Sequence, residues 1–199
     1  MNPRQLVIAV LVLVAASLGM ALYARHMQKH ARATVPAAYG GSMAPPASGP
    51  TEQATLFVAD DSSGELQPQQ DSIPLPEDRQ QRAQELVRAL LNIYLGKNSS
   101  HPIAPGSDVR DAYLVDPGVA VIDMNSAFAD GHRSGILVED LTVASLVETV
   151  AQNIPGILRV KILVNGQERD TLAGHADLSI LFDVPSAKQM VGQTADASQ

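Results

Sequence analysis

The chain contains no cysteine and no tryptophan among its 199 residues. The absence of cysteine excludes disulfides, thiolate zinc sites, iron–sulfur clusters, thiol nucleophiles and lipoprotein acylation. Aromatic residues make up only 4% of the chain, and sugar-binding sites usually stack their ligands on aromatic rings. The composition therefore counts against a carbohydrate-binding module.

Acidic residues are missing from the first 51 positions, which hold four basic ones: Arg4, Arg25, Lys29 and Arg32. Residues 52–199 therefore contain all 21 acidic residues and only 10 of the 14 basic ones, a net charge of −11. A body this acidic repels phosphate backbones, so the charge excludes nucleic-acid binding through an electrostatic surface.

A run of 18 uncharged, mostly apolar residues extends from Leu6 to Tyr23. As a helix it would span about 27 Å, enough to cross the hydrocarbon core of a bilayer. Its length and basic flanks predict a retained transmembrane anchor over residues 1–25. The alternative is a cleaved signal peptide, for which Gly19-Met20-Ala21 is only a fair cleavage site.

Residues 26–53 are rich in Ala, Pro, Gly and Ser and lack hydrophobic periodicity, which predicts a flexible linker. The basic residues that follow the apolar run favour a cytoplasmic body by the positive-inside rule. A spacer instead suits a domain held clear of the outer membrane surface. We expect a single-pass protein of the cell membrane with an extracytoplasmic C-terminal domain.

A folded domain is predicted over residues 54–183, before a disordered tail at 184–199. The expected elements are a strand at Thr55–Val58, a helix from Pro76 to Gly96, a hairpin of Val109–Val115 and Val119–Met124, a helix from an Asp140 N-cap to Pro155, a hairpin of Leu158–Val164 and Gln167–Leu172, and a strand at Leu178–Phe182. Two amphipathic helices can cover one face of a mostly antiparallel sheet, so the pattern predicts an α+β two-layer sandwich.

Turn chemistry supports both predicted hairpins. The first turns through Asp116-Pro117-Gly118 and the second through Asn165-Gly166. Asn-Gly is the preferred pair for a type I′ turn, because both central residues need a positive φ. Asn165 and Gly166 are therefore assigned a structural role.

The turn Gly174-His175-Ala176-Asp177 is the candidate functional segment, since it places a histidine two residues before an acid. Such a pair could act as a base and its orienting group, but it would also need a nucleophile. The alternative is a tight turn in which Gly174 has a positive φ and the polar side chains bond to their own backbone.

Asp123 ends an apolar strand and is interpreted as a strand cap or turn former. Together with Asp130 and Glu139 it could be recruited to a metal, but no ligand spacing indicates this. His101 and His132 lie in loop-like contexts and are interpreted as solvated. Because no cofactor motif accompanies these residues, we expect no cofactor, no metal and no catalytic set.

The domain resembles the GerMN, or sporulation and spore germination, family over residues 54–182. The resemblance rests on the order and spacing of several short segments: Leu56–Val58, Ser63–Leu66, Leu86–Leu91, Pro105–Ser107, Ala120–Asp123 with Phe128, Glu148–Val150, Val160–Gly166 and Thr171–Asp177. The family hairpin usually reads Asp-Gly where this chain has Asn165-Gly166. Its members are often lipoproteins, whereas this chain has no cysteine and would use its apolar segment instead.

The resemblance implies a non-enzymatic, extracytoplasmic module of an envelope complex, acting in sporulation or germination in spore formers. We therefore expect membrane attachment and binding to envelope proteins or to further copies of the chain. Two alternatives stay open. One is a peptidoglycan- or carbohydrate-binding module, and the other is a hydrolase that uses His175 and Asp177.

Overall fold

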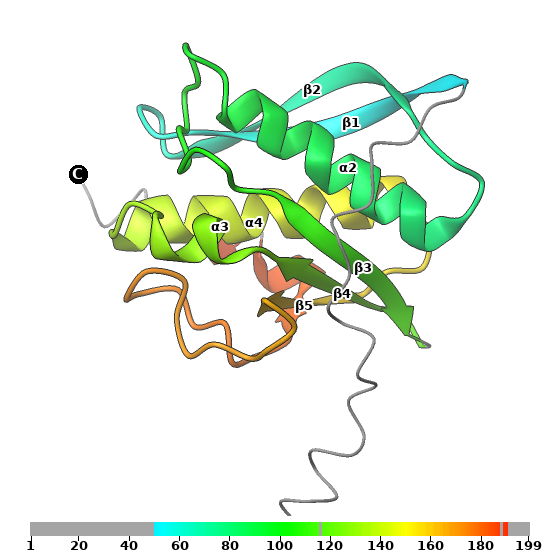
Figure 1. Cartoon of the computed structure of the whole chain (residues 1–199). Helices are drawn as coiled ribbons and strands as arrows, with labels where there is room; N and C mark the ends of the chain where they lie inside the picture. Colours follow the sequence, from blue (N-terminus) through cyan, green and yellow to red (C-terminus); the bar gives the residue numbers. More distant parts are fainter. Residues whose placement is uncertain (1–49, 116, 188, 191–199) are drawn as a thin grey trace, which may run out of the picture. The chain divides into compact units, whose positions relative to one another are not determined.

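The computed structural model describes residues 50–115, 117–187 and 189–190, all within one compact unit, Gly41–Gln199. Its elements are, in chain order, β1 (Thr51–Asp60), β2 (Glu65–Pro74), α2 (Arg79–Tyr94), β3 (Val109–Val115), β4 (Val119–Met124), α3 (Ser126–Asp130), α4 (Ile136–Asn153), β5 (Arg159–Val164) and β6 (Phe182–Asp183) (Figure 1). The chain is therefore α+β, as the sequence predicts.

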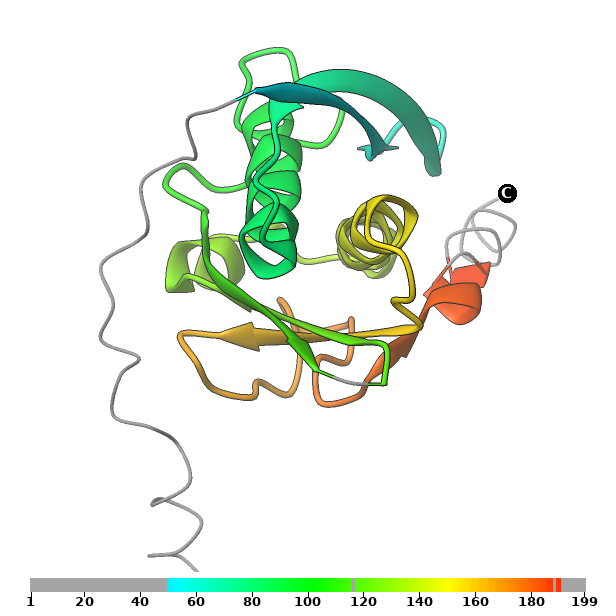
Figure 2. The same ribbon diagram turned by 90° about the vertical axis from the view of Figure 1, so that its right-hand side faces the viewer.

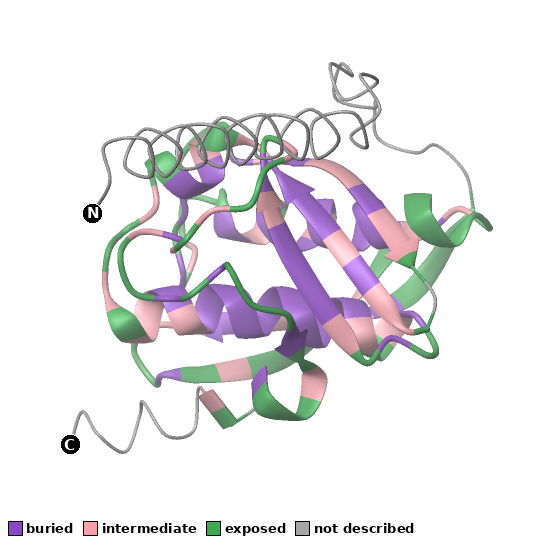
Figure 3. Ribbon diagram, turned by 90° about the horizontal axis from the view of Figure 1, so that it is seen from below, coloured by how far each residue is buried: buried purple, intermediate pink, exposed green. Residues whose placement is uncertain are grey.

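The elements form three layers and not the two that the sequence predicts. Helices α2 and α4 lie between the β1–β2 hairpin and a second, four-stranded sheet (Figure 2). Every residue of α4 from Leu141 to Val150 is buried (Figure 3). A helix that is buried on all sides needs neighbours on all sides, which two layers cannot supply.

The four-stranded sheet has the order β3-β4-β5-β6. The β3–β4 hairpin has the predicted bounds and is antiparallel. Strands β4 and β5 are parallel, because α3 and α4 carry the chain back to the same end of the sheet. The sheet is therefore mixed: its two outer pairs are antiparallel, in agreement with the prediction of a mostly antiparallel sheet, and its central pair is parallel.

Helix α2 confirms the predicted apolar stripe, since all of its members are buried: Ala83, Leu86, Val87, Leu90, Leu91 and Tyr94. The helix begins at Asp78, whose Oδ1 accepts the backbone N–H groups of Gln80 and Gln81 at 3.1 and 2.9 Å. The predicted start of α4 was wrong, because its N-cap is Gly135 and Asp140 lies inside the helix.

Side chains of α2 and α4 bind the free backbone edge of β1 in the β1–β2 hairpin. Asn153 Oδ1 accepts the N–H of Thr55 at 3.0 Å, and its Nδ2 donates to the carbonyl of Thr55 at 2.8 Å. Thr149 Oγ1 accepts the N–H of Phe57 at 3.0 Å, and the Tyr94 hydroxyl accepts the N–H of Ala59 at 2.9 Å. The helices thus satisfy the backbone groups that a third strand would otherwise pair.

The outer edge of β2 carries a proline where pairing would be possible. Pro68 lies opposite Phe57. Because the N–H of Phe57 turns toward α4, this pair is not hydrogen-bonded, and the backbone of residue 68 faces away from β1. Proline offers no N–H at this position, which blocks the addition of a further strand.

The Asn165-Gly166 turn is confirmed, with φ values of 53° and 72°. The strand predicted for Gln167–Leu172 was wrong, because only isolated bridges join Val164 to Gln167 and Thr171 to Asp177. The last strand is Phe182–Asp183, shorter and later than predicted. Residues 184–187 form a helical turn in which Ala187 is fully buried, so order continues past residue 183.

The predicted anchor from Leu6 to Tyr23 and most of the predicted linker lie outside the described residues. Within the described residues, no helix has both the length and the apolar character needed to cross a membrane.

Candidate functional site

A stripe of polar residues runs along one side of α4: Glu139, Thr142, Ser145, Thr149 and Asn153. Their spacing of three or four residues places them on one helical face. Thr149 and Asn153 bind the β1 backbone. Thr142 and Glu139, near the start of the helix, are the centres of two buried polar clusters. This stripe is the signal that the sequence reasoning missed, because it followed only the apolar positions.

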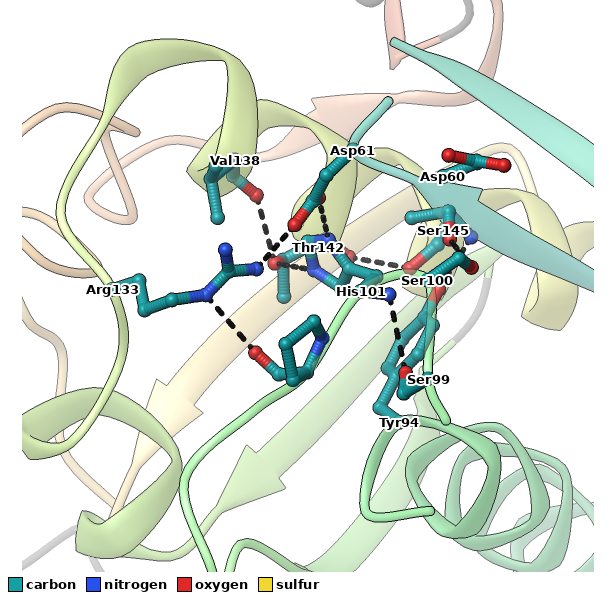
Figure 4. A network of polar contacts seen from close by, with 12 residues as sticks. Asp60, Asp61, Tyr94, Ser99, Ser100, His101, Arg133, Val138, Thr142 and Ser145 are labelled. Atoms are coloured by element: carbon teal, nitrogen blue, oxygen red, sulfur yellow. Dashed lines mark hydrogen bonds and ion pairs between the residues drawn. The ribbon is translucent and has the colours of Figure 1, made fainter. Parts of the chain in front are cut away.

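The first cluster, here called the histidine chain, consists of Asp61, His101, Thr142, His132 and Arg133. Figure 4 shows Asp61, His101, Thr142 and Arg133. His101 Nδ1 lies 2.5 Å from Asp61 Oδ1, and His101 Nε2 lies 2.6 Å from Thr142 Oγ1. On the other side of the same hydroxyl, His132 Nε2 lies at 2.8 Å, and His132 Nδ1 lies 2.8 Å from the carbonyl of Arg133. One threonine hydroxyl therefore bridges two imidazole rings.

The interpretation of His101 and His132 as solvated loop residues was wrong. His101 is fully buried, and His132 is half-buried. Burial disfavours a charged ring and lowers the pKa of His101, although its hydrogen bond to Asp61 acts in the opposite direction. Burial is also the main cause that lowers the pKa of His132, against the hydrogen bond to the carbonyl of Arg133.

Asp61, His101 and Thr142 have the order of a carboxylate, an imidazole and a hydroxyl in a nucleophilic triad. The hydroxyl is not placed to attack a substrate, however. Thr142 is fully buried, and its Oγ1 also lies 2.9 Å from the carbonyl of Val138 and 2.8 Å from His132. With three protein groups around the oxygen, the arrangement joins segments of the chain and leaves no approach for a reacting carbon.

The second cluster surrounds the fully buried carboxylate of Glu139. Its Oε2 accepts the backbone N–H groups of Ala173, His175 and Ala176, each at 2.9 Å. Its Oε1 accepts the N–H of Gly135 at 3.1 Å. Burial acts to raise the pKa of Glu139, but these hydrogen bonds and that from the His175 ring outweigh it and lower the pKa to about 2.

The two members of the predicted His175–Asp177 pair have different partners. His175 Nδ1 donates to Glu139 Oε1 at 2.9 Å, whereas Asp177 Oδ1 accepts from the N–H and the hydroxyl of Ser179 at 2.8 and 2.6 Å. Gly174 has a φ of +120°. Gly174 and Asp177 thus agree with the alternative of a tight turn, whereas the His175 ring bonds to Glu139 and not to its own backbone. Asp177 does not orient the ring.

Ser134 is the hydroxyl nearest to His175, with Oγ 3.4 Å from Nδ1. That nitrogen already donates to Glu139. A triad needs the carboxylate on one ring nitrogen and the nucleophile on the other. The geometry therefore gives no support to a hydrolase built on His175.

Asp123 is a turn former, as one sequence interpretation proposed. It is buried, its Oδ1 accepts the N–H of Gly166 at 2.7 Å, and its Oδ2 lies 3.2 Å from Arg110 Nε. The ion pair of Asp130 with Arg169 and the cluster around Glu139 are separate from it. Among the described residues no three His, Asp or Glu side chains are grouped so that they could hold a metal ion.

Comparisons with known proteins agree with the fold. A family model described as sporulation and spore germination (Germane) matches residues 55–170, more than half of the chain. The structure of the tandem GerMN domains of the sporulation protein GerM from Bacillus subtilis is similar, with a TM-score of 0.50 and 20% identity over 67% of this chain and 45% of that one. The chain thus spans less than half of the tandem structure.

The first GerMN domain of the same Bacillus subtilis protein is also similar on its own. It gives a TM-score of 0.50 and 22% identity, over 67% of this chain and 97% of the domain. None of the curated proteins matches the chain in sequence. The family model and the shared fold confirm the resemblance inferred from the sequence, and the chain belongs to the sporulation and spore germination family of GerMN domains.

Proposed function

We propose that the chain is a single-pass membrane protein whose domain lies outside the cytoplasm and acts in the cell envelope by binding proteins, including further copies of itself. In a spore-forming organism this role would belong to sporulation or germination, as the family description suggests. The apolar run from Leu6 to Tyr23 would be the anchor.

One observation supports binding over catalysis most directly. The side chains best suited to chemistry, His101, Thr142 and Glu139, are buried and bonded to other segments of the same chain. Catalytic groups must reach a substrate. These groups instead stabilise the fold, which leaves the exposed surface as the part of the domain that can act on other molecules.

The membrane topology can be tested with a reporter enzyme that is active only outside the cytoplasm, fused after Gln199. We expect activity in the full chain. A matched fusion to residues 26–199, without the apolar run, should be inactive. A cytoplasmic reporter that is active at the same position would contradict the proposed location.

Protein binding can be tested by placing a photo-crosslinking residue at exposed positions on different elements, such as Gln69 in β2, Ile136 in α4 and Leu158 before β5. A docking surface should give discrete protein adducts in intact cells from some of these positions and none from the others. If no position gives a protein adduct and the chain instead sediments with purified peptidoglycan, the glycan-binding alternative is correct.

A further inference from the structure

The histidine chain ends in two groups that can only accept hydrogen bonds. At one end is the carboxylate of Asp61, whose Oδ2 also accepts from Arg133 Nη2 at 2.5 Å. At the other end is the carbonyl of Arg133. Between them lie four consecutive contacts, from Asp61 to His101, to Thr142, to His132 and to that carbonyl. Each contact is a hydrogen bond only if one hydrogen lies in it.

The neutral chain does not have enough hydrogens for these contacts. A neutral imidazole supplies one N–H and a threonine one O–H. Two neutral histidines and Thr142 therefore supply three hydrogens for four contacts, so two lone pairs face each other at one of them. A single additional proton completes the series.

The contact of Thr142 with Val138 does not alter this count. The carbonyl of Val138 already accepts the backbone N–H of Thr142 within α4, as the helical pattern requires. The hydroxyl can therefore turn from this carbonyl to a ring nitrogen without leaving a buried acceptor unpaired.

The additional proton has two places. If His132 carries it, Thr142 donates to His101 Nε2, and if His101 carries it, Thr142 donates to His132 Nε2. The two forms differ only in the Nε2 hydrogens and the direction of one hydroxyl. We propose that His101, Thr142 and His132 bind one proton as a unit. With this proton bound, a complete series of hydrogen bonds joins the β1–β2 turn, the segment before Pro102 and the loop at residues 131–135.

Burial lowers the pKa of both rings, and the charges around them act in both directions. Asp61 from the β1–β2 turn and Glu139 from α4 attract a proton, whereas Arg133 repels it. Tyr94 from α2 faces His101 with its ring and stays neutral below about pH 12. The centroids of the two imidazole rings are 6.4 Å apart, so a first imidazolium opposes a second in this buried site.

When the proton leaves, one of the four contacts must open, and their relative strengths decide which one. The contact of Asp61 with His101 is charge-assisted and holds its hydrogen. Once both rings are neutral, the other three contacts have no charged partner. The contact of His132 with the carbonyl of Arg133 is the exposed one of the three, so it opens first and loosens the loop at residues 131–135. This inference goes beyond the proposed function and does not depend on it.

The test is a pH titration of the histidine rings of the full chain by nitrogen NMR, from pH 8 to pH 4, with the variant Thr142→Val. In the unmodified chain we expect the two rings to titrate in steps more than about one pH unit apart. Without the hydroxyl, two contacts remain for two hydrogens and no extra proton is needed. The first step of Thr142→Val should therefore move to lower pH by about one unit.

Thr149→Val is the matched control, since it removes a hydroxyl from the same face of α4 that contacts only β1. It should leave both steps in place. If Thr142→Val does not fold, His132→Gln tests the same point, because glutamine restores the hydrogen count and should also lower the titration midpoint of His101. Amide exchange at residues 131–135, compared as protection factors that remove the intrinsic pH dependence of exchange, should be slower below the first step than above it.

Three results would overturn the proposal. One is independent titration of the two rings in the unmodified chain. Another is a first step that neither Thr142→Val nor His132→Gln moves. The third is amide exchange at residues 131–135 that does not slow when the first proton binds.

Discussion

Glu139 holds His175 through both of its carboxylate oxygens: Oε1 accepts from the ring at 2.9 Å, and Oε2 accepts from the backbone N–H of the same residue, also at 2.9 Å. The two residues are 36 positions apart in the sequence. Since Glu139 also accepts the N–H of Gly135 at the start of α4, one buried carboxylate both caps a helix and fixes the loop that precedes β6.

The variant Glu139→Gln should therefore be less stable, and the loss should depend on pH. The pKa of Glu139 falls from an ordinary 4.5 to about 2 on folding, which corresponds to about 3 kcal/mol. This contribution is fully present above pH 4.5 and is lost as the pH falls toward 2. Chemical denaturation at pH 7 and pH 3 measures it, and the two proteins should be closer in stability at pH 3. The exposed Glu77→Gln should change stability by less than about 0.5 kcal/mol, and an equal loss in that control would contradict the assignment.

Removing the Asn153 side chain should detach the edge of β1 from α4. Asn153→Ala leaves the N–H and the carbonyl of Thr55 without their partner, which costs about 1–3 kcal/mol. Its neighbour Gln152 is exposed, so Gln152→Ala is the control and should be nearly neutral. Hydrogen exchange at Thr55 is the specific readout. Unchanged protection of that amide in Asn153→Ala would show that the contact does not matter.

Alanine substitutions at two glycines can distinguish the cost of a strained backbone from the cost of a steric clash. Gly118 and Gly156 both have a positive φ, +73° and +87°. A Cβ at Gly118 would lie 2.6 Å from the carbonyl oxygen of Gly156, whereas a Cβ at Gly156 has nothing within 4 Å. Gly156→Ala should cost about 1–2 kcal/mol from the left-handed backbone alone. Gly118→Ala should cost about 1–3 kcal/mol more, as measured by thermal or denaturant unfolding. Equal losses in the two variants would argue against the close approach.

Tyr94 should ionise well above the ordinary range of a tyrosine when the pH is raised. Burial raises its pKa to about 12, so the stability that it contributes is present below its unfolded value of about 10 and is lost as the pH rises through 12. An ultraviolet titration should show a late phase that is absent from Tyr94→Phe. The same variant should lose about 1 kcal/mol at pH 7, since the N–H of Ala59 loses its acceptor. A late phase that persists in Tyr94→Phe would assign it to another tyrosine.

Local sequence was sufficient where neighbouring residues decide the conformation. The stripe from Ala83 to Tyr94 produced α2 with its predicted apolar face. The β3–β4 hairpin has its predicted bounds, and Asn165 and Gly166 have the positive φ values that their turn type requires. In each case the signal lies within a few residues, because side-chain periodicity and turn preference are local properties.

Tertiary structure decided what depends on contacts between distant residues. The strand expected at Gln167–Leu172 is replaced by a loop. Asp123 and Glu139, from other elements, bind the backbone N–H groups of Gly166 and Ala173 on either side of it. His101 and Thr142 are 41 residues apart, and nothing in the spacing indicated that one hydroxyl would join two buried rings. The sequence by itself determined α2, the β3–β4 hairpin, the Asn165-Gly166 turn and the family. Which polar side chains are buried and bonded to other segments was decided only when the layers packed. A buried polar group must find its partner wherever the fold places one.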